Sequence, residues 1–149
     1  MTLPDLKQLE AIVKPAAQEL LVPGFGKHSY SYKADGSIIT AADVAMQKRL
    51  EDELGKIWPQ YAVLGEEMTE HEQRNAMNNA AGYWCIDPLD GTNNYATGMP
   101  FFAVSIALII NNRQVQGLIY DPLRDEVFTA TKGEGARLNG EILKGMPNK

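Results

Sequence analysis

Only one cysteine, Cys85, occurs among the 149 residues of this chain. A disulfide within the chain is therefore excluded, and a metal site built from several thiolates is not expected. Cys85 stands between Trp84 and Ile86 in an apolar stretch, where a free cysteine usually behaves as a small buried side chain. The sequence thus predicts a buried Cys85 and is compatible with a reducing cytoplasm.

Long apolar segments are also absent. The strongest apolar run covers residues 101–110, about half of the ~20 residues that a membrane-spanning helix needs. Residues 1–10 mix charged and apolar side chains, unlike the uninterrupted apolar core of a secretory signal peptide. We therefore expect a soluble, cytoplasmic protein without a membrane partner.

The chain has no run of Lys and Arg, and its net charge is -5. Nucleic acid and anionic membrane surfaces are therefore not expected as partners. An acidic protein can still bind phosphate when a metal ion reverses the local charge. The composition, 44% hydrophobic and 22% charged, is that of a globular domain. The length predicts a single domain over residues 1–149.

Two helices are predicted in the first part of the chain. Apolar residues recur every three or four positions over residues 6–20, which is the period of a helix with one buried face. Pro15 is expected to kink this helix, and Pro23-Gly24 to end it. A second helix is predicted over residues 41–55, with Thr40 as its N-cap.

The remaining elements are mainly strands, predicted at residues 28–33, 61–64, 82–86, 102–110, 114–120 and 126–131. Asn111-Asn112 and Asn139-Gly140 predict tight hairpin turns. Residues 102–110 show no polar alternation, which predicts a strand covered on both faces. Residues 68–80 are polar and are predicted to form a loop. This order favours an α+β fold with a largely antiparallel sheet over alternating βαβ units.

Two carboxylates follow the predicted strand at residues 82–86. Asp87 and Asp90 are separated by Pro88 and Leu89, and proline is expected to stop a regular strand and impose a turn. Mg²⁺ prefers oxygen ligands and shares its remaining positions with water and phosphate. Asp87, Asp90 and the Leu89 carbonyl could therefore form a metal cradle. The alternative is a turn in which these residues shape only the loop.

The residues directly after this pair are suited to an anion. Gly91 permits a positive φ or a close approach of the backbone to a ligand. Thr92-Asn93 could begin a helix, and the free N–H groups of a helix start can face a phosphate.

Two further stretches contribute acidic groups. Glu66 and Glu67 also follow a short apolar strand, so pairing of that strand with the one before Asp87 would bring both strand ends together. The alternative for this pair is a solvated acidic loop. Asp43 stands three residues after Thr40, the spacing of a helix capping box, and capping does not exclude a role in catalysis.

In order and spacing, these segments resemble the inositol monophosphatase family, and the resemblance covers essentially the whole chain. The segments are Ile-Ile-Thr-Ala-Ala-Asp at 38–43, Gly-Glu-Glu at 65–67, Trp-Cys-Ile-Asp-Pro-Leu-Asp-Gly-Thr-Asn-Asn-Tyr at 84–95, Gly-Met-Pro-Phe-Phe-Ala-Val-Ser-Ile at 98–106, Tyr-Asp-Pro at 120–122 and Gly-Glu-Gly-Ala at 133–136. The resemblance implies a layered α-β sandwich, with two N-terminal helices on the sheet.

The resemblance also implies roles for individual residues. The metal ligands are Glu66, Asp87, the Leu89 carbonyl and Asp90. Substrate contacts fall on Glu66, Leu89, Asp90, Gly91 and Thr92, with the backbone of Gly91 and Thr92 holding the phosphate. Catalysis falls on Asp43, Glu66 and Thr92, of which Asp43 and Thr92 orient and deprotonate the attacking water. Lys33 matches a lysine near the family's site only loosely.

The implied reaction is hydrolysis of a small sugar or polyol phosphate, such as inositol monophosphate, by water activated on Mg²⁺ without a phosphoenzyme. Histidinol phosphate, fructose 1,6-bisphosphate, a nucleotide 3′-phosphate and a dinucleotide phosphate remain open as substrates. A homodimer is also implied. A haloacid-dehalogenase-type nucleophile is excluded because Asp87 and Asp90 are one residue too far apart for D-x-D, and an EF-hand is excluded by Gly91 and Gly98 at ligand positions.

The chain departs from the family in one respect. Family members continue into a second half with a Trp-Asp motif that supplies a further metal ligand, whereas neither Trp58 nor Trp84 is followed by Asp. We therefore expect a weaker second metal position and uncovered apolar strands, including residues 102–110, that promote self-association. The rival hypothesis is a non-catalytic module that binds cations weakly and acts by association.

Overall fold

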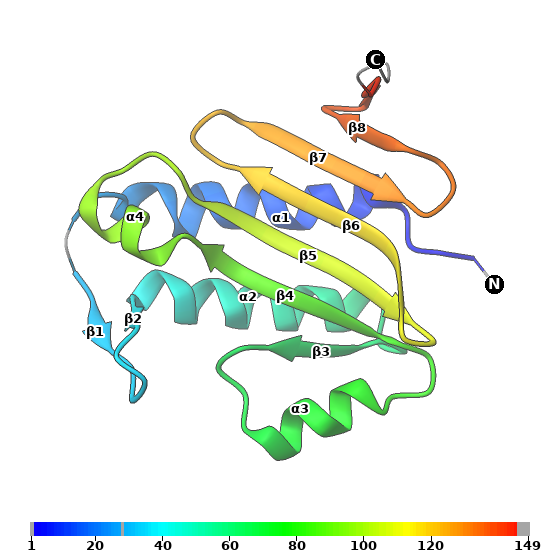
Figure 1. Cartoon of the computed structure of the whole chain (residues 1–149), viewed down its shortest axis with the longest axis horizontal. Coiled ribbons are helices and arrows are strands. Elements are labelled where there is room, and N and C mark those ends of the chain that lie inside the picture. Colours follow the sequence, from blue (N-terminus) through cyan, green and yellow to red (C-terminus); the bar gives the residue numbers. More distant parts are fainter. Residues whose placement is uncertain (1, 28, 146–149) are drawn as a thin grey trace.

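Two long helices lie side by side against one face of a seven-stranded sheet (Figure 1). The computed structural model describes residues 2–27 and 29–145. Its helices are α1 (Leu6–Leu20), the 3₁₀ turn η1 (Val22–Gly24), α2 (Ala41–Ile57), α3 (Glu70–Met77) and α4 (Thr92–Thr97). The sheet contains β3 (Ala62–Gly65), β4 (Tyr83–Asp90), β5 (Ala103–Ile110), β6 (Arg113–Asp121), β7 (Glu126–Thr131), β8 (Ala136–Leu138) and β9 (Glu141–Ile142) in sequence order. The expected α+β class, with helices packed on a sheet, is confirmed.

Both long helices begin where the sequence places a cap. The Asp5 carboxylate accepts a hydrogen bond from the Lys7 N–H (2.9 Å) at the start of α1. Thr40 and Asp43 form a reciprocal capping box at the start of α2, which satisfies two N–H groups that otherwise lack partners in the first turn. Pro15 lies inside α1 without ending it.

The first hairpin lies beside the start of α2. It pairs β1 (Ser31–Tyr32) with β2 (Ile38–Ile39) in antiparallel register. The turn between them contains Gly36, with a φ of 87°, as the Ala-Asp-Gly sequence predicts. The predicted strand at 28–33 is shorter in the structure, and its first position, residue 28, lies outside the described residues.

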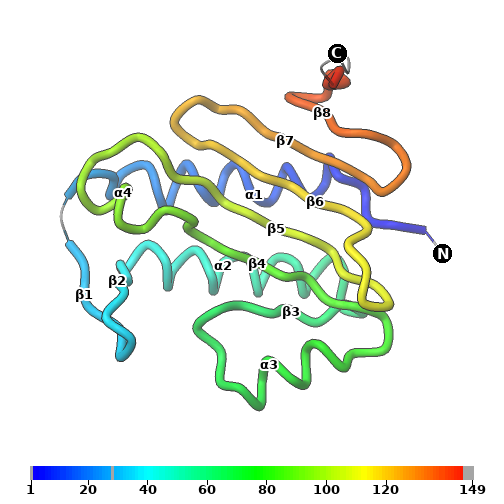
Figure 2. Tube along the Cα trace, in the orientation of Figure 1, coloured from blue at the N-terminus to red at the C-terminus, as the bar shows by residue number. Residues whose placement is uncertain are grey.

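The connection from β3 to β4 is helical, so the predicted loop at 68–80 is wrong. Helix α3 begins after Thr69, whose hydroxyl accepts a hydrogen bond from the Glu72 N–H (3.2 Å). Of its residues only Ala76 is buried, which explains why the segment has no apolar periodicity. This excursion, clear in the trace of Figure 2, lets β3 pair parallel with β4, whereas the other neighbouring strands of the sheet are antiparallel.

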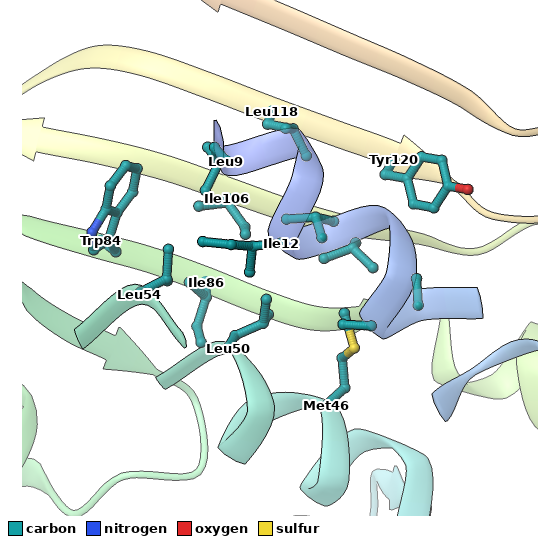
Figure 3. Packing of buried hydrophobic residues seen from close by; sticks show 14 of the residues in the cluster. Leu9, Ile12, Met46, Leu50, Leu54, Trp84, Ile86, Ile106, Leu118 and Tyr120 are labelled. Carbon is teal, nitrogen blue, oxygen red and sulfur yellow. The ribbon is translucent and has the colours of Figure 1, made fainter. Parts of the chain in front are cut away.

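The core lies between the helices and the covered face of the sheet (Figure 3). It is formed by large side chains that are at most 6% exposed: Leu9 and Ile12 of α1, Met46, Leu50 and Leu54 of α2, and Trp84, Ile86, Ile106, Leu118 and Tyr120 of the sheet. Burial of apolar surface at about 25 cal/mol per Å² is the main stabilising contribution of this layer.

The opposite face of the sheet carries no helix in the described part of the chain (Figure 1). On β5 the buried residues alternate with half-buried ones, so the predicted coverage of both faces is wrong. Cys85 on β4 also points to this side and is exposed, which corrects its predicted burial. Ile119 and Phe128 are 48% and 37% exposed on the same face. Apolar composition alone could not distinguish a half-covered strand from a fully covered one.

Candidate metal and phosphate site

The ends of β3 and β4 meet at the start of α2. Because the two strands are parallel and Gly65 pairs with Ile86, the next residue on each strand path is acidic: Glu66 follows the end of β3, and Asp87 lies within β4. In Figure 1 both strands point toward the side of the molecule that holds the hairpin β1–β2 and the first turn of α2. The expected meeting of the two acidic segments is confirmed at the level of the backbone.

A β-bulge places the second carboxylate. Asp87 pairs with Ser105 and Asp90 with Ala103, and the register shifts between the two pairs. The strand therefore continues through Pro88, where the sequence predicted that it would stop. In a regular strand, residues three apart point to opposite faces, and the extra residue of a bulge re-aims the side chain. The bulge thus explains how both carboxylates line one cavity.

Gly91 occupies a backbone position that other residues enter only with strain. Its φ is 93°, and a Cβ at this position would lie 2.7 Å from the Phe101 carbonyl oxygen. Gly91 is also the N-cap of α4, which starts at Thr92 as the sequence predicts. The first N–H groups of α4 therefore lie at the wall of the same cavity, to which Thr92 and Asn93 contribute.

Asp43 belongs both to the capping box of α2 and to the candidate site. Its Oδ2 accepts hydrogen bonds from the Thr40 N–H (2.8 Å) and the Thr40 hydroxyl (2.6 Å). Its Oδ1 lies 3.1 Å from the Thr92 hydroxyl, which lies equally close to the Leu89 carbonyl oxygen. The carboxylate is only 8% exposed. Asp43 therefore caps α2 and fixes Thr92 at the same time.

A cavity of about 420 Å³ collects the residues that the sequence singled out. Its lining includes Lys33, Asp43, Glu66, Asp87, Leu89, Asp90, Gly91 and Thr92. Burial raises the pKa of the Asp87 carboxyl above its ordinary value, and the Asp90 carboxylate raises it further. Ionising this carboxyl thus costs more than it would in water, and a bound divalent cation would offset that cost. The oxygen-rich lining is the donor set that Mg²⁺ prefers.

Glu66 lies at the rim of this cavity rather than against the β4 carboxylates. Its side chain is 72% exposed, and its Oε1 is 3.6 Å from the Lys33 ammonium, which lies 2.6 Å from Glu67. The hydrogen bond to Glu67 raises the pKa of Lys33. Within residues 2–27 and 29–145, no three acidic, His or Cys side chains are already drawn together into a metal-binding cluster. Glu66 would have to leave Lys33 to share a cation with Asp87 and Asp90.

Sequence reasoning missed several residues of the cavity wall, among them Ser37, Gln47 and Asn94. Gln47 follows Asp43 by one helical turn, so it shares a helix face with a residue that was singled out. That spacing could have identified it. Ser37 stands in a polar loop with no distinguishing pattern, whereas Asn94 belongs to the segment 84–95 that resembles the family, where no role was assigned to it.

In the described ranges, no helix is both long enough and apolar enough to cross a bilayer.

Comparison with known proteins places the chain among phosphatases and their relatives. A family model described as the inositol monophosphatase family matches residues 4–149. The Nus factor SuhB of Escherichia coli K12 is 42% identical over 115 residues, which are 77% of this chain and 42% of that protein. The inositol monophosphatase of Dictyostelium discoideum is 44% identical over 112 residues, 75% of this chain and 40% of that protein. The chain thus spans less than half the length of these two curated relatives.

Solved structures show the same fold. The extragenic suppressor protein SuhB of Bartonella henselae superposes with a TM-score of 0.80 and 34% identity, covering 93% of this chain and 54% of that one. An IMPase from Thermotoga maritima superposes with a TM-score of 0.82 and 28% identity, covering 97% of this chain and 55% of that one. In both, the match accounts for little more than half of the solved chain.

Proposed function

Because this chain belongs to the inositol monophosphatase family, we propose that it supplies the cation- and phosphate-binding part of a Mg²⁺-dependent phosphomonoesterase. The convergence of Asp43, Asp87, Asp90 and Thr92 on one cavity, with Glu66 at its rim, is the observation that supports the proposal most directly. These side chains come from three stretches of sequence, around residues 43, 66 and 87–92, and together they give the cavity an oxygen-rich lining.

Asp87, Asp90, the Leu89 carbonyl and Glu66 would hold Mg²⁺. When bound, the cation neutralises charge on the phosphate and lowers the pKa of a bound water. The Thr92 hydroxyl donates toward Asp43, so its remaining lone pair can accept a hydrogen bond from the attacking water. Asp43 can then take up the proton through Thr92. The water oxygen forms a bond to phosphorus and the bond from phosphorus to the alcohol oxygen breaks. The departing alkoxide takes a proton from a second water, and the hydroxide that remains takes up the proton held by Asp43.

The proposed substrate is a small phosphorylated polyol or sugar, such as inositol monophosphate. Gly91 and Thr92 line the cavity, where their N–H groups could hold a phosphate, and Glu66 and Asp90 line the same cavity and could contact the groups around it. Histidinol phosphate, fructose 1,6-bisphosphate and a nucleotide 3′-phosphate share the same reacting group and remain alternatives. A cytoplasmic location and a homodimer are part of this proposal.

The test is phosphate release from inositol monophosphate with and without Mg²⁺. Asp90→Asn is expected to lower the Mg²⁺-dependent rate more than ~100-fold, because it removes a carboxylate that would hold the cation. Asp52→Asn is the matched control, since Asp52 lies on the exposed side of α2 and, among the described residues, pairs only with Lys48. An unchanged rate for Asp90→Asn would contradict the assignment.

A second candidate is a non-catalytic module that binds cations and acts by association. Two observations favour it. A relative that is 42% identical to this chain carries the name Nus factor. The open face of the sheet exposes Ile119 and Phe128. Cation binding without measurable turnover in the same assay would support this candidate over the first.

A further inference from the structure

Gln47 is a buried polar side chain in the wall of the candidate site. It lies one turn after Asp43 on α2, is 8% exposed and lines the cavity. Its Nε2 donates a hydrogen bond to Oε1 of Glu51, at 2.6 Å. Its Oε1 has no hydrogen-bond partner among the described residues. An unpaired buried acceptor is unfavourable, so a donor supplied by a bound water would stabilise this side chain.

The orientation of the Gln47 amide is fixed from two sides. Exchanging its nitrogen and oxygen would place two oxygens together at Glu51, which a carboxylate does not tolerate. The other side of the amide packs on Gly65, where a Cβ would lie 2.2 Å from Nε2 and 2.6 Å from Oε1. Gly65 is the last residue of β3 and precedes Glu66. The absent side chain at Gly65 is thus what allows the amide to lie between the start of α2 and the acidic strand end.

A second glutamine shows what is particular to this position. Gln116 on β6 is 6% exposed, and its Oε1 also lacks a partner in the described part of the chain. Its Nε2 donates to the Pro4 carbonyl oxygen (2.8 Å), and it does not line the carboxylate cavity. The two residues therefore share burial and an unpaired oxygen, and differ in that Gln47 lines the cavity of the acidic groups and Gln116 does not.

We infer that Gln47 is a positioning residue of the cation site, whose Oε1 accepts a hydrogen bond from a water bound to the cation. The inference rests on the proposed function. Mg²⁺ keeps several of its waters in protein sites, and each such water needs hydrogen-bond acceptors in the cavity wall. Removing a group that holds metal-bound waters or ligands in place typically weakens metal binding 10- to 100-fold.

The test measures binding of Mn²⁺ to the whole chain by the paramagnetic resonance signal of the free ion. Gln47→Met keeps the length and packing but removes the acceptor, and is expected to weaken Mn²⁺ binding about 10-fold. Gln47→Glu keeps an oxygen at the position and is expected to bind at least as tightly as wild type. Gln116→Met is the matched control and should bind Mn²⁺ like wild type.

Thermal unfolding in excess chelator separates this role from a packing role. Gln47→Met removes the unpaired acceptor and also the hydrogen bond to Glu51, so its unfolding temperature should stay close to that of the wild type. If that variant does not fold, Gly65→Ala displaces the amide without replacing it and is expected to weaken Mn²⁺ binding in the same direction.

The outcomes distinguish the two proposals. Wild-type affinity in both Gln47→Met and Gly65→Ala, with binding lost in Asp90→Asn, overturns the inference and leaves the proposed function standing. Absence of Mn²⁺ binding by the wild-type chain overturns both.

Discussion

Replacing Asp43 by alanine removes three hydrogen bonds that its buried carboxylate accepts, two from Thr40 and one from Thr92. The Asp43 N–H still donates to the Thr40 hydroxyl, so half of the capping box survives. A hydrogen bond to a charged group contributes ~1.5–3 kcal/mol and a neutral one ~1 kcal/mol. Allowing for the solvation that the removed carboxylate no longer loses, we expect unfolding to become ~3 kcal/mol easier.

The measurement is urea unfolding in excess chelator, so that no cation contributes. In a thermal unfolding experiment on a chain of this size, the same ~3 kcal/mol would lower the unfolding temperature by about 6–12 °C. Asp5→Ala is the control, because its carboxylate caps α1 with one exposed hydrogen bond and should cost only ~1 kcal/mol. Asp43→Asn keeps an acceptor for Thr40 and should also cost ~1 kcal/mol, while removing the charge at the cavity. The reasoning is wrong if Asp43→Ala is no less stable than Asp5→Ala.

Three further predictions concern other parts of the molecule. Gly91→Ala should lose at least ~1 kcal/mol of unfolding free energy in urea, because of its positive φ and the Phe101 carbonyl; a loss below ~0.5 kcal/mol, the range of neutral surface changes, would contradict this. Burial and the hydrogen-bonded Asp125 raise the pKa of Tyr120 to about 12, so one tyrosinate should appear near that pH in absorbance at 295 nm. The unfolded side chain ionises near pH 10, so the stability of the fold should fall as the pH rises from 10 to 12. Ionisation of every tyrosine by pH 10.5 would refute this prediction. Ile119→Lys should reduce self-association in analytical ultracentrifugation without loss of stability, because Ile119 is 48% exposed; a strictly monomeric wild-type chain would contradict the expectation.

Local signals predicted much of the fold. The period of apolar residues located α1 and α2, and Thr40 gave the start of α2. Asn111 and Asn112 both have positive φ, and Asn139-Gly140 joins β8 to β9, as their turn chemistry requires. These features depend on residues close in sequence, which is why the sequence alone could specify them.

The errors have a common physical origin in long-range packing. Helix α3 lacks an apolar stripe because it lies at the edge of the sheet and buries only Ala76. Cys85 is exposed because the helices cover only one face. Of two adjacent phenylalanines before β5, Phe102 is buried whereas Phe101 is 57% exposed. Which face of a strand is covered depends on elements far away in the chain.

The site was predictable in composition but not in arrangement. Acidic residues at strand ends identified Glu66, Asp87 and Asp90, and each borders the cavity. The bulge that turns Asp90 inward and the packing of Gln47 on Gly65 depend on backbone pairings that no short motif encodes. The metal roles of these residues stay predictions, to be decided by the binding measurements above.

The wall of the cavity is assembled from the hairpin β1–β2, the first turns of α2, and the ends of β3 and β4. These segments separate when the protein unfolds. An ion bound among them would therefore act as a removable cross-link between regions that are far apart in the sequence. Free Mg²⁺ at 100 times its dissociation constant would favour the folded chain by about 2.7 kcal/mol. Removal of the ion by a chelator would then destabilise the contact between α2 and the sheet before it affects the hairpins farther from the cavity.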